Sequence, residues 1–167
     1  MDVLIVRHAR AQDRQIFALK GKPDAKRPLT EEGKQRMARA MPGLGSFVLA
    51  LHAIATSPWL RAVQTAEIMA DHFGPEPVIL KALEPPVDFD GVCQWLAEQR
   101  GNCIALVGHE PDLGWLASRF LTGGDESFMP LKKAGACLIG FDGPPAAGTG
   151  ELRWLITPAQ LRKIGGD

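Results

Sequence analysis

Three short apolar runs constrain what this chain can fold into. Residues 3–6, 52–55 and 103–107 are each four or five residues long and apolar along nearly their whole length. Runs of this kind are typical of strands that are buried on both faces of a parallel sheet. Longer segments with helix-start and helix-stop signals lie between them, and such alternation indicates helices on both faces. The sequence therefore predicts a single-domain, three-layer α/β/α sandwich with a mostly parallel central sheet.

Capping and breaking residues place the other elements. Thr30 is a candidate N-cap for a helix that should end near Met41, because Pro42 and a glycine follow it. Ser57 and Asp90 are candidate N-caps for two later helices. We expect helices at residues 30–41, 44–51, 58–73, 90–101, 111–123 and from 158 onward, further strands at 78–80, 136–141 and 152–156, and mainly a loop at 7–28.

Length and charge limit the classes of function. A chain of 167 residues fits one domain spanning residues 1–167. The 19 basic and 19 acidic residues balance, which argues against general nucleic-acid binding. Residues 1–39 nevertheless carry ten Lys and Arg against five Asp and Glu. This local excess fits either a solvated positive face or a basic rim around an anion site.

The lengths of the apolar runs and the cysteine content indicate in which cellular compartment the protein is expected. No stretch reaches the roughly 18 apolar residues of a membrane span, and the first apolar run is too short for a signal peptide. We therefore expect no membrane association. Cys93, Cys103 and Cys137 are odd in number and lack CxxC spacing, which argues against a disulfide framework or a zinc site. Cysteines that form no disulfides are typical of a reducing environment, so the sequence predicts a cytoplasmic protein.

Polar residues end the three apolar runs. Arg7 and His8 follow the first run, His109 follows the third, and Arg61 comes shortly after the second. Ligands of open α/β sheets bind beyond the carboxyl ends of the strands, so parallel neighbours would bring these four side chains into one crevice. Each also has a structural interpretation: a surface Arg-His pair, a solvated helix arginine, a histidine that caps a helix. The two histidines outside this set, His52 and His72, are interpreted as structural.

A phosphate group would satisfy this constellation. Two guanidinium groups can each bind phosphate oxygens in a fork, and the helix that follows residue 57 adds backbone N–H groups. A second imidazole adds a donor, and the remaining neutral imidazole can attack phosphorus to form a covalent intermediate. The cationic side chains would balance the charge that develops in phosphoryl transfer, so we expect neither a metal nor another cofactor.

Four motifs occur in order along the first two thirds of the chain: LIVRH at 4–8, RPLTEEG at 27–33, SPWLRAVQTA at 57–66 and LVGHEPDL at 106–113. Together they resemble the histidine phosphatase (phosphoglycerate mutase-like) superfamily. The short length, the Arg-Pro-Leu-Thr segment and the Val-Gly-His-x-Pro segment are most similar to the SixA-type branch, the phosphohistidine phosphatases. The chain after Leu113 matches more loosely.

The resemblance implies a role for each matching residue. His8 matches the nucleophile that becomes phosphohistidine, and Arg7 and Arg61 match the arginines that bind the phosphate. His109 matches the second pocket histidine, which contacts the phosphoryl group. Arg27 matches a motif position outside this set and receives no firm role.

Two departures from the family pattern bear on the chemistry. The family usually has glycine after the Arg-His pair, where this chain has Ala9, which is tolerable if the backbone there keeps a negative φ. The usual acid position holds a proline, so Glu84, Asp88, Asp90 or none of them could serve as general acid. A phosphohistidine ring that is already protonated leaves without an acid, whereas an alkoxide needs one. The missing acid therefore favours an N–P substrate.

Several functions remain open on these residues. Hydrolysis of phosphohistidine on a protein, such as a phosphorelay domain, is the first. A small-molecule phosphatase acting on a sugar phosphate is the alternative, and a catalytically dead phosphate-binding scaffold is a third. A mutase fits less well because the chain is short, and no HxxxH-type spacing supports a metal hydrolase. The segment at residues 10–26 is expected to overhang the pocket, where it could recognise an acidic phosphoprotein.

Overall fold

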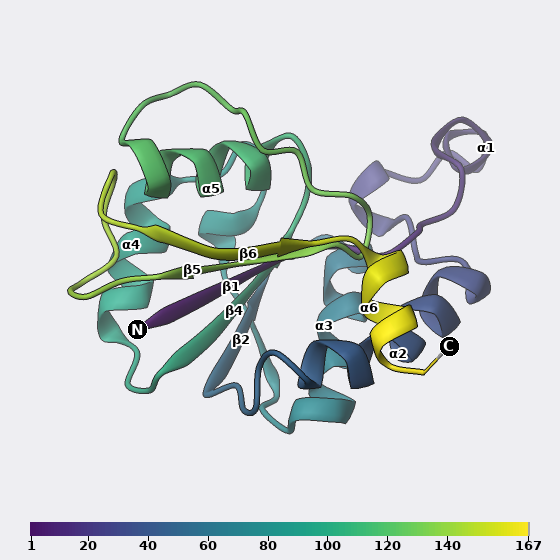
Figure 1. The fold of residues 1–167 in the computed structure, drawn as a ribbon. Helices are drawn as coiled ribbons and strands as arrows, with labels where there is room; N and C mark the ends of the chain where they lie inside the picture. Colours follow the sequence, from purple (N-terminus) through teal and green to yellow (C-terminus); the bar gives the residue numbers. More distant parts are fainter. Residues whose placement is uncertain (167) are drawn as a thin grey trace.

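A six-stranded sheet forms the centre of the molecule (Figure 1). The computed structural model describes residues 1–166. The sheet order is β3-β2-β4-β1-β5-β6; the first four strands are mutually parallel, β5 is antiparallel to β1, and β6 is antiparallel to β5. The strands are β1 (Asp2–Arg7), β2 (Ala53–Thr56), β3 (Pro77–Ile79), β4 (Cys103–Gly108), β5 (Ala136–Gly140) and β6 (Glu151–Ile156).

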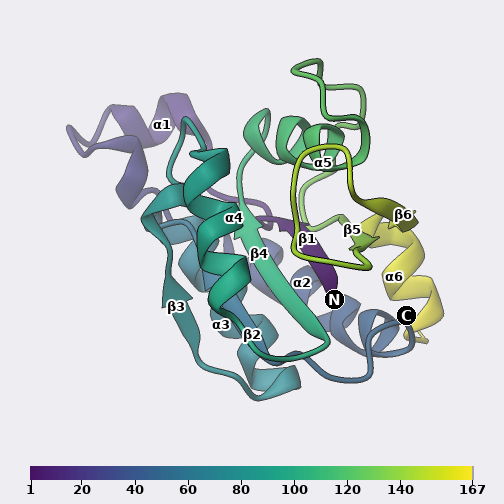
Figure 2. The same cartoon turned by 90° about the vertical axis from the view of Figure 1, so that its left-hand side faces the viewer.

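Helices cover both faces of the sheet, as the sequence predicted (Figure 2). Side chains of β1 alternate between two cores: Leu4 belongs to one, and Ile5 belongs to the other. This alternation follows from the two-residue period of a strand. The first core contains residues of α2 (Glu31–Gly45), α3 (Leu60–Phe73) and α6 (Pro158–Ile164), and the second contains residues of α4 (Phe89–Glu98) and α5 (Asp112–Thr122). The three-layer α/β/α prediction is confirmed.

The central parallel pair positions the later functional residues. β1 and β4 pair in register from Asp2 opposite Cys103 to Arg7 opposite Gly108. The next backbone N–H, that of His8, donates to Gly108 O at 3.0 Å. In the neighbouring strand, the N–H of Ser57 donates to Val107 O at 2.9 Å. The loops that leave β1, β2 and β4 therefore begin side by side at one edge of the sheet.

Helix α2 is longer than the sequence predicted. It runs through Pro42 to Gly45, so both the expected end at Met41 and the separate helix over 44–51 are wrong. Pro42 removes one backbone donor, but Met41 and Leu44 are buried in the core that α2 shares with α6. At Gly43, an added Cβ would overlap the carbonyl oxygen of Leu161, so α6 packs directly on the α2 backbone. This tertiary contact outweighs the helix-breaking tendency.

The segment at 7–28 is not only a loop. It contains the short helix α1 (Arg14–Ala18) and a 3₁₀ helix, η1 (Asp24–Lys26). The Asp13 carboxylate caps α1 by accepting from the backbone N–H groups of Gln15 and Ile16. A five-residue helix offers too little periodicity to be recognised from sequence. The segment projects from the end of the sheet at which β1 terminates (Figure 1).

Two predicted N-caps are wrong. α3 begins at Leu60 rather than at residue 58, because the backbone of Ser57 still bonds to β4. α4 is capped by Asp88, whose Oδ1 accepts from Gly91 N at 3.1 Å, whereas Asp90 lies in the first turn. The sequence has aspartate at both 88 and 90, and the prediction placed the cap two residues too late.

The remaining helices and strands lie within one residue of the predicted bounds, except that α4 ends at Glu98 and not near residue 101. α5 ends at Gly123, which adopts a left-handed conformation with φ of 77°. Thr157 and Gln160 form a reciprocal capping box at the start of α6. The three cysteines are free thiols. Across residues 1–166, no helix has both the length and the apolar character needed to cross a membrane.

Replacing Gly43 with alanine should test the close packing of α2 on α6. We expect Gly43→Ala to lower the free energy of unfolding by about 1–3 kcal/mol, because the new methyl group forces α6 away from α2. The matched control is Gly143→Ala, where an added Cβ would meet nothing within 4 Å. Urea denaturation of both variants measures the difference. Equal stability of the two variants would contradict the close contact.

Candidate active site

The four predicted site residues line one cavity of about 580 Å³ at the carboxyl edge of the sheet. Arg7 ends β1, His8 follows it, and His109 follows β4. Arg61 lies in the first turn of α3, which starts after β2. The rings of His8 and His109 lie with their centroids 5.1 Å apart. The structure therefore brings together all four residues that the sequence singled out.

His8 presents an unprotonated nitrogen to its surroundings. Its Nδ1 lies 2.7 Å from Ala9 O, a carbonyl that can only accept, so the ring hydrogen resides on Nδ1. Nε2 accepts from Arg61 Nε at 3.2 Å. Burial, together with the nearby charges of Arg61 and Arg7, lowers the pKa of His8 to about 3. The imidazole is therefore neutral near pH 7, and its Nε2 lone pair is occupied only by the hydrogen bond from Arg61.

Ala9 fits the position that glycine usually occupies in the family pattern. The only non-glycine residue of the described chain with positive φ is Ala134, so the backbone at Ala9 does not need glycine. The Ala9 side chain is buried, and its N–H donates to Thr65 Oγ1 at 3.0 Å. Thr65 in turn donates to the carbonyl of Arg61 at 2.7 Å. A short chain of bonds thus connects the segment after His8 to the helix that carries Arg61.

Arg61 is buried and held by Asp24. Its Nη1 donates to the backbone carbonyl of Asp24 at 3.0 Å, and its Nη2 lies 3.2 Å from the Asp24 carboxylate. The guanidinium also lies 4.5 Å from the ring of Trp59. Burial lowers the pKa of Arg61 to about 10, which leaves the group charged. Asp24 therefore fixes both terminal nitrogens while Nε points at His8.

Asp24 is also the partner of other cations at the cavity. Its carboxylate accepts from Arg27 Nε at 2.8 Å and lies 3.9 Å from Arg14 Nε. Burial alone would raise the pKa of Asp24, but the Arg27 hydrogen bond and the charge of Arg61 lower it overall. Arg27 also donates to Gln12 O at 2.7 Å, and this bond joins the beginning of the projecting segment to its end. Asp24 is thus an ionised carboxylate surrounded by three arginines.

Two buried nitrogens at the cavity lack a hydrogen-bond partner within the described chain. They are Arg7 Nε and His109 Nδ1. Arg7 Nη1 donates to Leu131 O at 2.7 Å, and His109 Nε2 lies 2.9 Å from Ser57 Oγ. Burial, which is the larger cause, and the charge of Arg61 together lower the pKa of His109 to about 2. Buried polar atoms are almost always paired, so two unpaired nitrogens in one cavity indicate a ligand-binding position.

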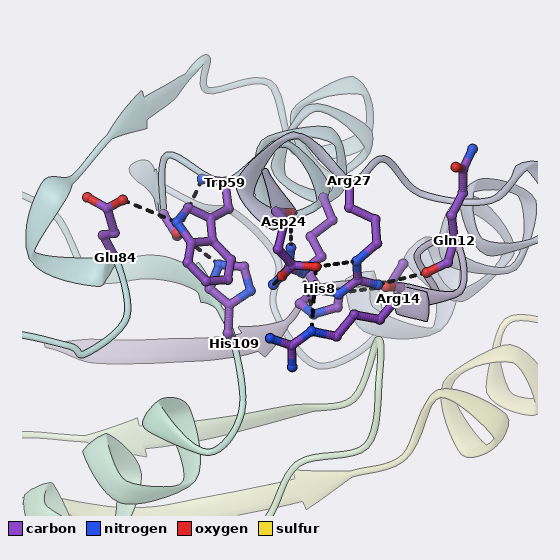
Figure 3. A network of polar contacts seen from close by, with 11 residues as sticks. His8, Gln12, Arg14, Asp24, Arg27, Trp59, Glu84 and His109 are labelled. Atoms are coloured by element: carbon purple, nitrogen blue, oxygen red, sulfur yellow. Dashed lines mark hydrogen bonds and ion pairs between the residues drawn. The ribbon is translucent and has the colours of Figure 1, made fainter. Parts of the chain in front are cut away.

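The carboxylates that the sequence offered as acids do not line the cavity. Glu84 accepts from Trp59 Nε1 at 3.2 Å and lies on the side of the indole away from His8 (Figure 3). Asp88 caps α4, and Asp90 follows it in the first turn of that helix.

The carboxylates that do line the cavity are all engaged with neighbouring groups. Glu110 Oε1 accepts from Leu131 N at 2.8 Å, and burial raises the pKa of Glu110. Asp112 Oδ1 accepts from Val87 N at 3.0 Å. Asp13 caps α1, and Asp24 binds the arginines. No carboxylate among residues 1–166 therefore faces the cavity with both oxygens unengaged and ready to donate a proton.

The sequence missed several residues that line the cavity. Asp24 and Trp59 are the most important, because both contact Arg61. Trp59 stood inside a recognised motif, and its ring also lies 4.8 Å from that of His109. Asp24 had only one signal, its position three residues before Arg27 within the basic first 39 residues. Groups of three or more His, Cys, Asp or Glu that could hold a metal ion do not occur within residues 1–166.

Comparison with known proteins identifies a family and several similar chains. Residues 3–84 match the model of the histidine phosphatase superfamily (branch 1). An uncharacterized protein of Picosynechococcus sp. is 37% identical over 81% of this chain and 82% of its own length. The phosphohistidine phosphatase SixA of Escherichia coli (strain K12) is 25% identical over 97% of both chains. A solved structure of the protein histidine phosphatase SixA in complex with tungstate superimposes with a TM-score of 0.77 at 25% identity, covering 96% of this chain and 99% of that one.

The protonation state of His8 can be measured directly. We expect no protonation of His8 between pH 8 and pH 5, because its pKa lies near 3, well below the ordinary value of about 6.5. Nitrogen-15 NMR of the imidazole should show hydrogen on Nδ1 and a bare Nε2 throughout this range. The His8→Ala variant identifies the signal. Protonation of His8 with a midpoint above pH 5 would contradict the buried, neutral imidazole.

Proposed function

Because this chain belongs to the histidine phosphatase superfamily, we propose that it is a phosphatase that works through a covalent phosphohistidine intermediate on His8. The preferred substrate in this proposal is phosphohistidine on a protein. The observation that carries the proposal is the geometry of the cavity. A bare Nε2 on His8 lies beside a buried arginine, Arg61, and two buried nitrogens without partners, Arg7 Nε and His109 Nδ1.

In the first step, His8 Nε2 attacks phosphorus. A new N–P bond forms, the bond from phosphorus to the leaving group breaks, and the leaving group takes that electron pair. The bond between Arg61 Nε and His8 Nε2 must open, which frees a donor for a phosphoryl oxygen. Arg7 Nε supplies another donor. If the Ser57 hydroxyl donates to His109 Nε2, the ring hydrogen sits on Nδ1, and His109 becomes a third.

In the second step, water attacks the phosphorylated histidine. The P–O bond forms, the N–P bond breaks, and His8 leaves with its lone pair restored on Nε2, releasing inorganic phosphate. The hydrogen bond from His8 Nδ1 to Ala9 O keeps the ring in the same orientation through both steps. The arginines and the His109 donor supply the charge stabilisation, so we propose that the reaction is metal-independent.

The leaving group follows from the engaged carboxylates. Asp24 binds arginines, and Glu110 and Asp112 each accept a backbone N–H through one oxygen, so we assign none of these three carboxylates as the acid for an alkoxide. A phosphohistidine whose ring is protonated leaves as neutral imidazole and needs no such acid. The similarity to SixA phosphohistidine phosphatase over 97% of both chains supports the same choice. We place this activity in the cytoplasm, where the free thiols stay reduced.

The projecting segment supports a protein substrate. Ile16 and Leu19 on and beside α1 are 64% and 87% exposed, which is unusual for large apolar side chains. Lys20, Lys22 and Lys26 line a neighbouring hollow on the same segment. Apolar contacts surrounded by positive charge suit an acidic protein partner such as a phosphorelay domain. The second candidate, a small phosphomonoester such as a sugar phosphate, is favoured by the cavity volume of about 580 Å³, which is typical of small-molecule sites.

The nucleophile can be tested by substitution and trapping. We expect His8→Ala to lower turnover of an aryl phosphate at least about 10³-fold, because the covalent route is lost. Rapid-quench trapping in the presence of EDTA should yield an acid-labile, alkali-stable phosphoenzyme in the unmodified protein but not in the variant. His72→Ala, near the exposed end of α3, is the control. Substantial activity of His8→Ala, or turnover that requires added Mg²⁺ or Zn²⁺, would contradict the mechanism.

The substrate choice can be tested with a phosphohistidine protein and a panel of sugar phosphates. We expect kcat/KM to be higher for the phosphoprotein, and we expect the triple variant Lys20→Gln, Lys22→Gln, Lys26→Gln to lower that preference about tenfold at low salt, because three positive charges are lost. The matched control changes Lys34, Lys81 and Lys163 to Gln, since these lysines do not line the cavity or the hollow beside α1. Higher kcat/KM for the sugar phosphates would favour the second candidate.

A further inference from the structure

Lys133 is a cation at the active-site cavity that has no anionic partner. It precedes β5 and lines the same cavity as His8 and His109. Its side chain is exposed, and no hydrogen bond or ion pair of its Nζ occurs within residues 1–166. Partial burial and the charges of Arg7, Arg27 and Arg10 lower the pKa of Lys133, with Asp13 as the opposing charge. Lys133 therefore lies among several cations, and the one acid that acts on it, Asp13, forms no ion pair with it.

Each of the other cations of the cavity has at least one acceptor. Arg27 and Arg61 bind Asp24, and Arg14 lies near the same carboxylate. Arg10 lies 3.0 Å from the Glu32 carboxylate. The last of them, Arg7, donates to the Leu131 carbonyl. Lys133 thus differs from the other cavity cations of the described chain in lacking a partner.

The backbone next to Lys133 is hydrogen-bonded to the backbone of the proposed nucleophile. The next residue, Ala134, has a φ of 60°, a left-handed backbone conformation that residues other than glycine rarely adopt. Its N–H donates to both Arg7 O at 3.1 Å and His8 O at 3.2 Å. Arg7 N donates in turn to Gly135 O at 3.1 Å. The turn that carries Lys133 is therefore bonded to the two residues of the phosphate site, and an uncommon conformation is maintained at this point.

A second hollow opens beside the first. It has a volume of about 390 Å³, and Arg10 and Lys133 line both. Its other basic residues are Arg36, which pairs with Glu32, and Arg162. Lys133 therefore stands between the phosphate cavity and a basic surface that leads away from it. An anion placed there would relieve the repulsion between Lys133 and the neighbouring arginines.

We propose that Lys133, assisted by Arg10, binds a second anionic group of the substrate, adjacent to the phosphoryl group that is removed. This inference rests on the proposed phosphatase function and narrows its substrate class. The second group is a carboxylate or a phosphate. It can come from an acidic side chain next to a phosphohistidine in a protein, or from a second acid on a small molecule.

Paired aryl phosphates isolate the charge of the second group. The 2-, 3- and 4-carboxyphenyl phosphates are compared with the corresponding carbamoylphenyl phosphates, which are also electron-withdrawing but carry no charge. For at least one position we expect kcat/KM to favour the carboxylate about tenfold at low ionic strength, and we expect added salt to reduce this ratio because Lys133 is exposed. The three positions sample three distances from the phosphoryl group.

Variants of Lys133 assign the preference. Lys133→Met should bring the carboxylate-to-carbamoyl ratio close to one, and Lys133→Arg should restore most of it. Lys132→Met is the matched control, because it removes the same charge from the neighbouring exposed residue, which does not line the cavity. The inference is overturned if the unmodified protein shows no preference at any position, or if Lys133→Met keeps the full ratio.

Binding measurements separate this inference from the proposed function. If no aryl phosphate is turned over, the phosphatase proposal fails, but calorimetry with the same pairs on His8→Ala protein still reports the ratio of dissociation constants. A ratio near one, unchanged in the His8→Ala, Lys133→Met double variant, overturns the second-anion site. A ratio near ten that the Lys133 change abolishes supports it.

Two substrate series then distinguish the sources of the anion. One compares phosphohistidine peptides with Asp or Asn beside the phosphorylated residue, and the other compares 2-phosphoglycolate with ethyl phosphate. A preference for the acidic member that depends on Lys133 in the peptides alone assigns the second anion to a protein, and in the small molecules alone to a metabolite-sized acid. Lack of Lys133-dependent preference in both series overturns the inference.

Discussion

The parallel pairing of β1 with β4 is the contact on which the site depends. Six consecutive residue pairs align the two strands, so His8 and His109 follow Arg7 and Gly108 at the same level of the sheet. Both strands are buried along nearly their whole length, which fixes their register through the apolar contacts on each face. A shift by one residue would turn Leu4 and Ile5 to the opposite cores and separate the two imidazoles. The positions of the catalytic candidates are therefore a consequence of core packing.

Burial at this edge sets the electrostatics of the site. The charges of Arg7, Arg61 and Arg27 all act on His8; Asp24 pairs with Arg61 and Arg27, and Glu110 is the acid that acts on Arg7. The same cations and the same low-dielectric surroundings keep His8 and its neighbour His109 neutral. A dianionic phosphoryl group entering the cavity would favour protonation of His109 and would compete with Asp24 for Arg61. The neutral state of the two histidines thus belongs to a site that is short of negative charge.

The sequence predicted the parts of the molecule that rest on local patterns. Continuous apolar runs identified β1 and β4, and their polar ends identified Arg7, His8 and His109. Arg61 was found because it stands in the first turn of the helix after β2, inside a recognisable motif. These features depend on only a few neighbouring residues, together with the rule that parallel strands end at one edge.

The sequence did not predict features that depend on contacts between distant segments. Asp24 reaches Arg61 across 37 positions through a segment that the pattern presented as a loop. Helix α2 continues past Pro42 because α6, more than a hundred residues later, packs on Gly43. Lys133 carries no local signal, since its place at the cavity follows from the bonds of Ala134 to Arg7 and His8.

The chemistry of the proposed intermediate clarifies why the missing acid matters less for one class of substrate. With phosphohistidine as substrate, the phosphoryl group exchanges the N–P bond of the substrate for an N–P bond to His8. The bonds broken and formed in the first step are therefore of the same kind. The leaving imidazole carries away a proton that its ring already holds, and Asp24 can stay ionised among its arginines. An ester would instead release an alkoxide beside carboxylates that are all engaged. An acid-poor, cation-rich cavity is therefore better matched to an N–P bond than to an O–P bond.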